Sequence, residues 1–199
     1  MTITPDEPYR RNRDQDPTGT TPEWAPMEPL PSSEMFLLAF AGLPRVIAPD
    51  LLDPAADLVQ CQRECRVALR VLSDPASSAE RMKTAAGQLV SARADIDMLI
   101  TVIDEAVAVW LARLWRHGQT DRTDQAASGL ADGGENDVVV HTESVGDIVA
   151  RMAGLWDVLL TRPEALDELP EVCRLCELSA AYDYLAAEIE SGRRIPPGL

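Results

Sequence analysis

Residues 75–117 read PASSAERMKTAAGQLVSARADIDMLITVIDEAVAVWLARLWRH, and this stretch decides the fold. Its heptad-like seam is spaced alternately four and three residues apart and is apolar at every position but one: Met82, Ala86, Leu89, Arg93, Ile96, Ile100, Ile103, Val107, Trp110 and Leu114. A mean spacing of about 3.5 residues is typical of a helix that packs lengthwise on other helices. At about 1.5 Å per residue, this helix would be about 60 Å long and would form the centre of the domain.

The two halves of this helix differ in apolar content. From Ile96 onward a second apolar row runs beside the first and contains Leu99, Val102, Ala106 and Val109. A wider apolar stripe predicts that the second half is buried more completely than the first. Arg93 interrupts the seam, and we expect its side chain to reach solvent or to pair with a carboxylate of a facing helix.

The composition of the whole chain also favours helices. Of the 199 residues, 46% are hydrophobic and only 5% are aromatic, and runs typical of strands are nearly absent. Further helices are expected near residues 34–41, 53–72, 144–160 and 164–191, where apolar residues recur at helical spacing. We therefore predict an all-α helical bundle of about four main helices with one long central helix.

Two segments are too polar or too rich in proline to join that bundle. Residues 1–32 hold seven of the fifteen prolines, which predicts a disordered, proline-rich acidic tail before a single domain at 33–199. Residues 118–141 are rich in glycine and aspartate, and we predict a long, flexible acidic loop there. Within the tail, Trp24, Met27 and Leu30 form an extended apolar strip that could dock on a partner or on the protein's own bundle.

The net charge restricts the classes of partner. A formal charge of −15 argues against nonspecific binding to nucleic acid or to an anionic membrane, because both need a positive surface. No targeting segment or membrane span is evident, so we predict a cytoplasmic protein. Lys83 is the only lysine among 18 basic residues, a bias typical of a GC-rich bacterial genome.

The four cysteines form two pairs. Cys61 and Cys65 are four residues apart on one predicted helix, and Cys173 and Cys176 are three apart on another, so each pair shares a helical face. Four thiolates could hold zinc or an iron–sulfur cluster between the two helices. Core packing is the plainer interpretation, because Cys61 and Cys65 lie in an apolar stripe where a free cysteine behaves as a small hydrophobe. Thiol redox chemistry is the third interpretation.

No set of residues typical of catalysis is evident. The two histidines, His117 and His141, flank the predicted acidic loop, and no phosphate-binding glycine loop or Glu-x-x-His pair is present. The leading prediction is a non-enzymatic interaction or adaptor protein, or a self-associating one, with Trp24, Met27, Leu30 and Arg93 as candidate contact residues. The alternative is a metal- or redox-responsive regulator built on the four cysteines. A pocket between helices that serves a small-molecule enzyme is a third possibility.

Overall fold

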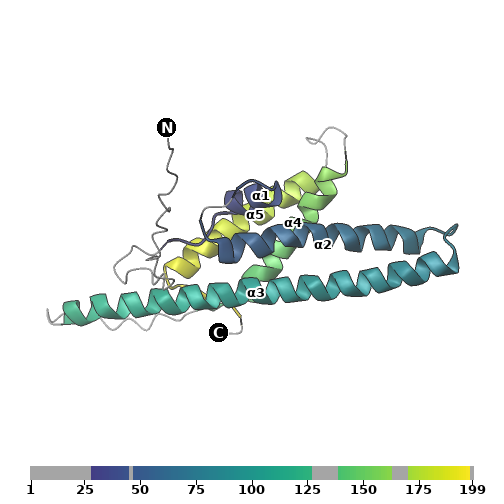
Figure 1. The fold of residues 1–199 in the computed structure, drawn as a ribbon. Coiled ribbons are helices and arrows are strands. Elements are labelled where there is room, and N and C mark those ends of the chain that lie inside the picture. The colour runs from purple at the N-terminus through teal and green to yellow at the C-terminus, as the bar shows by residue number, and fades with distance from the viewer. Residues whose placement is uncertain (1–27, 45–46, 127–138, 163–169, 198–199) are drawn as a thin grey trace, which may run out of the picture.

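A computed structural model describes residues 28–44, 47–126, 139–162 and 170–197 of the chain (Figure 1). Five helices make up most of this described part, in the order α1 (Ser33–Phe40), α2 (Pro49–Ser73), α3 (Ala79–Ala126), α4 (Val145–Leu160) and α5 (Pro170–Glu190). The prediction of an all-α bundle with one long central helix is therefore confirmed. Residues 1–27 of the predicted tail and residues 127–138 of the predicted loop lie outside the described residues.

The longest helices form an antiparallel hairpin. Figure 1 shows α2 lying along one half of α3, with α3 extending well beyond α2 at the other end. The turn between them is held by Asp74, whose Oδ1 accepts a hydrogen bond from the Ala76 N–H at 2.9 Å. With 48 residues, α3 is about 72 Å long and continues past the predicted end at His117.

The start of α2 differs from the expectation. The helix begins at Pro49, four residues before the predicted start at residue 53, and it contains Pro54 within its length. Proline at the first helical position has its φ angle already set and loses no helical hydrogen bond, so Pro49 is a suitable first residue. Ala48 precedes it in the left-handed conformation, with φ at 47°.

Helix α4 packs closely on α3 where it starts. Ser144 caps α4, accepting a hydrogen bond from the Asp147 N–H at 3.0 Å, and Gly146 donates its N–H to Oδ1 of Asp104 on α3 at 2.8 Å. A Cβ atom at Gly146 would lie 2.6 Å from the carbonyl oxygen of Ile100. Only glycine therefore allows this approach without displacing a helix.

A small parallel sheet joins the segment that precedes α4 to the segment that follows α5. Strand β1 (Val139–Val140) pairs with β2 (Arg194–Ile195), and the N–H of His141 extends the ladder to the Ile195 carbonyl at 2.9 Å. The strands lie directly before α4 and directly after α5, so their pairing fixes the start of one helix near the end of the other.

Residues 28–32, which the sequence assigns to the disordered tail, pack on the helices. Leu30 is buried, and its N–H donates to Oε1 of Glu190 at 2.8 Å. The carbonyl of Pro31 accepts a hydrogen bond from the hydroxyl of Tyr182 at 2.7 Å. The packed structure therefore includes residues N-terminal to the predicted boundary at 33.

The buried face of α3 is rotated from the predicted seam in its first half. Ala85 and Ala92 are buried there, whereas the predicted seam residues Met82, Ala86 and Arg93 are exposed. The side chain of alanine is small, so α2 and α3 can approach closely when the face with Ala85 and Ala92 is turned toward α2.

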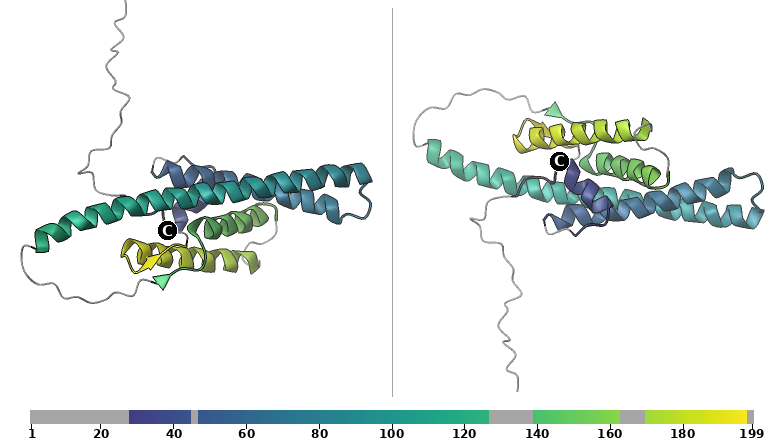
Figure 2. Two further views of the ribbon diagram at one scale, coloured as in Figure 1. Left: turned by 90° about the horizontal axis from the view of Figure 1, so that it is seen from below. Right: turned by 90° about the horizontal axis from the view of Figure 1, so that it is seen from above.

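The second half of α3 is buried more completely than the first, as predicted, but the predicted second apolar row is only partly enclosed. Leu99, Ile103 and Val107 are buried, but Val102 and Val109 of the predicted second row are 41% and 52% exposed. The reason is that α2 and α4 cover neighbouring sides of α3, while its remaining side has no described helix against it (Figure 2). Among the described helices, none combines the length and apolar character needed to cross a membrane.

Candidate functional site

A groove runs over α4 between α2 and α5. It consists of a hollow of about 700 Å³ and an adjoining one of about 320 Å³, which share the lining residues Gln62, Gly154 and Val158. Ala150, Gly154 and Val158 are spaced four residues apart, so they lie in a row along one face of α4 and form the floor. The larger hollow is bounded on its far side by Arg174 and Leu178 of α5, and it is open to solvent.

The floor of the groove is shaped by one glutamine and one glycine. Gln62 reaches across from α2, and its Nε2 donates a hydrogen bond to the Ala150 carbonyl at 3.1 Å. The Gln62 side chain also packs beside Gly154, since a Cβ atom there would lie 3.4 Å from the Gln62 amide carbon, an ordinary van der Waals contact. Gln62 thus marks the junction of the two hollows and fixes the spacing of α2 and α4.

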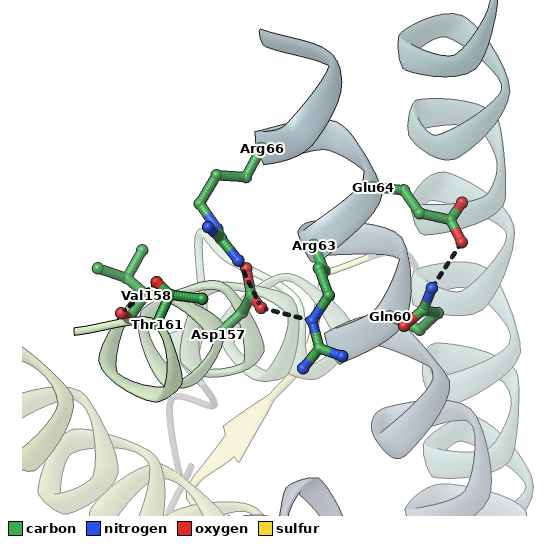
Figure 3. A network of polar contacts seen from close by, with 7 residues as sticks. All are labelled: Gln60, Arg63, Glu64, Arg66, Asp157, Val158 and Thr161. Carbon is green, nitrogen blue, oxygen red and sulfur yellow. Dashed lines mark hydrogen bonds and ion pairs between the residues drawn. The ribbon is translucent and has the colours of Figure 1, made fainter. Parts of the chain in front are cut away.

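Asp157 lies under the smaller hollow and joins α4 to α2 (Figure 3). Its carboxylate is 1% exposed and accepts hydrogen bonds from Nε of Arg63 at 3.1 Å, and from Nε and Nη2 of Arg66 at 2.6 and 3.0 Å. Buried carboxylates require such partners, because an unpaired charge out of water is strongly unfavourable. Two guanidinium groups around one carboxylate leave this part of the groove with excess positive charge.

Two further arginines line the groove without such partners. Arg93 borders the smaller hollow and Arg174 the larger one, both are exposed, and within the described residues neither forms an ion pair with a carboxylate. Arg151 also lines the groove but is paired with Glu143 at 2.7 Å. Glu177 also lines the larger hollow, so the excess of positive charge lies at the smaller hollow, where Arg66 and Arg93 outnumber the single carboxylate of Asp157.

The predicted contact residue Arg93 therefore lies at the groove, beside Cys65. Burial raises the pKa of the Cys65 thiol, and the nearby Arg93 partly offsets this by favouring the thiolate. Of the predicted apolar strip, Leu30 is buried in the bundle, while Trp24 and Met27 lie outside the described residues. Leu30 contributes to the core and does not present a free docking surface.

The four cysteines stay in two separate pairs. Cys65 is buried and Cys61 half-buried on α2, whereas Cys173 and Cys176 are exposed on α5. Burial, with a smaller contribution from Asp95, also raises the pKa of Cys61. In the part of the chain that the structure describes, no three side chains of the His, Cys, Asp or Glu type are grouped to hold a metal ion. A redox or metal role for these thiols stays a prediction from the sequence.

The sequence did not single out Asp157, Arg66 or Arg174. One signal was available, since Asp157 is the only charged residue in the run MAGLWDVLL and a lone acid among apolar residues indicates a buried partner. Arg174 gave no such signal, because an exposed arginine is ordinary on a helix surface. Comparisons with protein-family models, curated proteins and solved structures found no match to this chain.

Proposed function

We propose that this chain is a protein-interaction module whose groove binds an acidic, amphipathic helix of a partner protein. The observation that carries the proposal is the position of Arg93 and Arg174, two arginines without a carboxylate partner in the described structure, beside an apolar floor. An apolar floor with an arginine at each edge, and one carboxylate, Glu177, on the α5 side, suits a helix that has one apolar face flanked by glutamate or aspartate.

The shape of the groove supports a helix over a small molecule. Small-molecule sites enclose most of their ligand's surface, whereas this groove is open along one side and is bordered by three helices. A partner helix needs only one of its faces covered, as in other helix-in-groove complexes. Ala150 and Gly154 carry little or no side chain, so a helix could approach α4 closely along the floor.

The chemistry of arginine supports an acidic partner. A guanidinium group offers a planar set of donors that matches a carboxylate, and such charge-assisted hydrogen bonds are stronger than neutral ones. The overall charge of −15 opposes an acidic partner at long range. At physiological ionic strength, however, exposed charges are largely screened beyond about 8 Å, so direct contacts with Arg93 and Arg174 would outweigh it.

The proposal is tested with a synthetic fluorescent peptide designed as an amphipathic helix with leucines on one face and flanking glutamates. Anisotropy should show that it binds the full chain, and that Arg93→Glu with Arg174→Glu weakens binding by at least about tenfold. Each charge-assisted hydrogen bond contributes about 1.5–3 kcal/mol, and about 1.4 kcal/mol corresponds to tenfold in affinity.

Two controls separate groove binding from general charge effects. Arg70→Glu with Arg81→Glu makes the same change in charge on exposed arginines of α2 and α3 that do not line the groove, and it should leave binding unchanged. A peptide with lysine in place of glutamate should bind poorly. Equal binding of the two peptides, or equal loss in both double variants, would contradict the proposal.

A further inference from the structure

The side of α3 that faces away from α4 carries a second seam at heptad spacing. Its members are separated alternately by four and three residues and are all exposed: Met98, Val102, Glu105, Val109 and Ala112. Met98 is 56% exposed, Val102 41% and Val109 52%. We call these five residues the outer seam.

The outer seam is distinct from the surface that holds the bundle together. Ile100, whose carbonyl oxygen lies beside Gly146 of α4, is on nearly the opposite side of α3 from Met98 and Val109, given about 100° of rotation per residue. Seen from below, α3 lies in front of the other described helices, and none of them crosses it on the viewer's side (Figure 2, left). Isolated apolar residues are common on surfaces, but apolar residues repeated at 3.5-residue spacing are typical of a helix–helix contact.

We propose that a second copy of this chain covers the outer seam, with the two α3 helices packed antiparallel. The distribution of charge beside the seam favours this orientation. Asp95 continues the spacing of the seam at its N-terminal end and Arg116 continues it at its C-terminal end, with Arg113 next to Ala112. Antiparallel packing brings the acidic end of each copy to the basic end of the other, whereas parallel packing brings like charges together.

The spacing of the seam also fits an antiparallel register centred on Glu105. In that register Val102 lies opposite Val109 of the second copy, and Met98 lies opposite Ala112 of the second copy. Each layer thus combines either two residues of equal size or a large residue with a small one. Glu105 faces its own copy at the two-fold axis, and this like-charge contact weakens the pair.

The size of the seam predicts a weak dimer. Residues 95–116 extend over about 33 Å, and a helix–helix contact is about 10 Å wide, so the area covered is well below the roughly 800 Å² per partner of a stable complex. Association should therefore be reversible and lost on dilution. This inference does not depend on the groove, which involves other residues.

Sedimentation of the full chain over a wide range of concentration tests the inference. We expect a monomer–dimer equilibrium that Val109→Asp weakens by at least about tenfold. The matched control is Val90→Asp, because Val90 is on the same helix and 71% exposed but lies outside the outer seam. Glu105→Gln should tighten the dimer by removing the contact between two carboxylates. Strict monomers at every concentration, or an equal effect of both aspartate substitutions, would overturn the inference.

Charge reversal tests the orientation and the identity of the occupant. Asp95→Lys, and separately Arg116→Glu, should each weaken self-association, and a mixture of the two variants should form a mixed dimer. A photo-crosslinking residue at Met98 should link to the peptide that contains Ala112 of the other copy. Crosslinks from Met98 to Met98 would indicate parallel packing and refute the register.

The chain's own N-terminal segment is the competing occupant of the outer seam. If the full chain were monomeric but dimerised after Trp24→Ala with Met27→Ala, the outer seam would be assigned to that segment and the inference would be wrong. Circular dichroism of every variant confirms that a loss of association is not a loss of fold.

Discussion

The network of Asp157, Arg63 and Arg66 gives a sharp test of how burial sets the energy of an ion pair (Figure 3). The side chain of Asp157 is 1% exposed, that of Arg66 19% and that of Arg63 44%. Removing the arginines would leave a carboxylate that water cannot reach. Removing the carboxylate would leave two guanidinium groups that can turn to solvent.

These differences in exposure predict an order of destabilisation. Arg63→Met with Arg66→Met should lower the free energy of unfolding by about 3–5 kcal/mol, because it leaves a buried charge unpaired. Asp157→Ala should cost less, about 1–3 kcal/mol, since the stranded groups are partly exposed. Between the single arginine variants, Arg66→Met should cost more than Arg63→Met, because Arg66 donates two hydrogen bonds and is the more buried. The loss from Arg63→Met should stay within about 1 kcal/mol.

Urea unfolding followed by circular dichroism measures these free energies. Arg162→Met is the matched control, since Arg162 pairs with Glu171 at 3.3 Å while 47% exposed, and it should change stability by no more than about 1 kcal/mol. The reasoning is refuted if Asp157→Ala costs as much as the double arginine variant, or if Arg63→Met costs more than Arg66→Met. Either result would mean that exposure in the folded state does not determine the energy of this network.

Three substitutions test the packing, and one labelling experiment tests the thiols. Tyr182→Phe leaves the buried Pro31 carbonyl without its donor and should cost about 1–3 kcal/mol. Burial raises the pKa of Tyr182, so this tyrosine's contribution is complete below pH of about 10, where unfolded tyrosine ionises, and is lost as the pH rises further. Urea unfolding at neutral and alkaline pH should therefore show the wild type losing stability relative to Tyr182→Phe. Gly146→Ala should destabilise by about 1–3 kcal/mol, because its Cβ would lie 2.6 Å from the Ile100 carbonyl oxygen. Gly87→Ala, with no atom within 4 Å of the added Cβ, should instead stabilise by about 1 kcal/mol, measured in the same way. Iodoacetamide should label the two exposed α5 cysteines faster than the two α2 cysteines, because burial raises the pKa of both α2 thiols; mass spectrometry measures the rates.

The pattern of apolar residues predicted the helices but not which side of the long helix is buried. Ala85 and Ala86 are chemically identical neighbours, yet only Ala85 is buried. In an alanine-rich segment, two adjacent heptad phases fit the same residues almost equally well. Packing against α2 buries the face that contains Ala85, and on that arrangement Arg93 is exposed beside the groove.

The candidate site was predictable only in part. Arg93 drew attention because it interrupts an apolar seam, and that property belongs to one helix alone. Arg174 shares the groove with it but lies more than 80 residues further along the chain. No local pattern links two such residues, because their proximity depends on how α4 and α5 pack against the hairpin.

The sequence by itself determined the helical class, the long central helix and the surplus of acid, because residue spacing and charge are local or additive properties. The tertiary structure alone decided that residues 28–32 join the bundle, that Asp157 is enclosed by Arg63 and Arg66, and that the outer seam is left uncovered. Each of these depends on which helices lie against each other. The spacing of apolar residues in the sequence predicts that a helix has an apolar face. Only the arrangement of the neighbouring helices determines whether that face is buried.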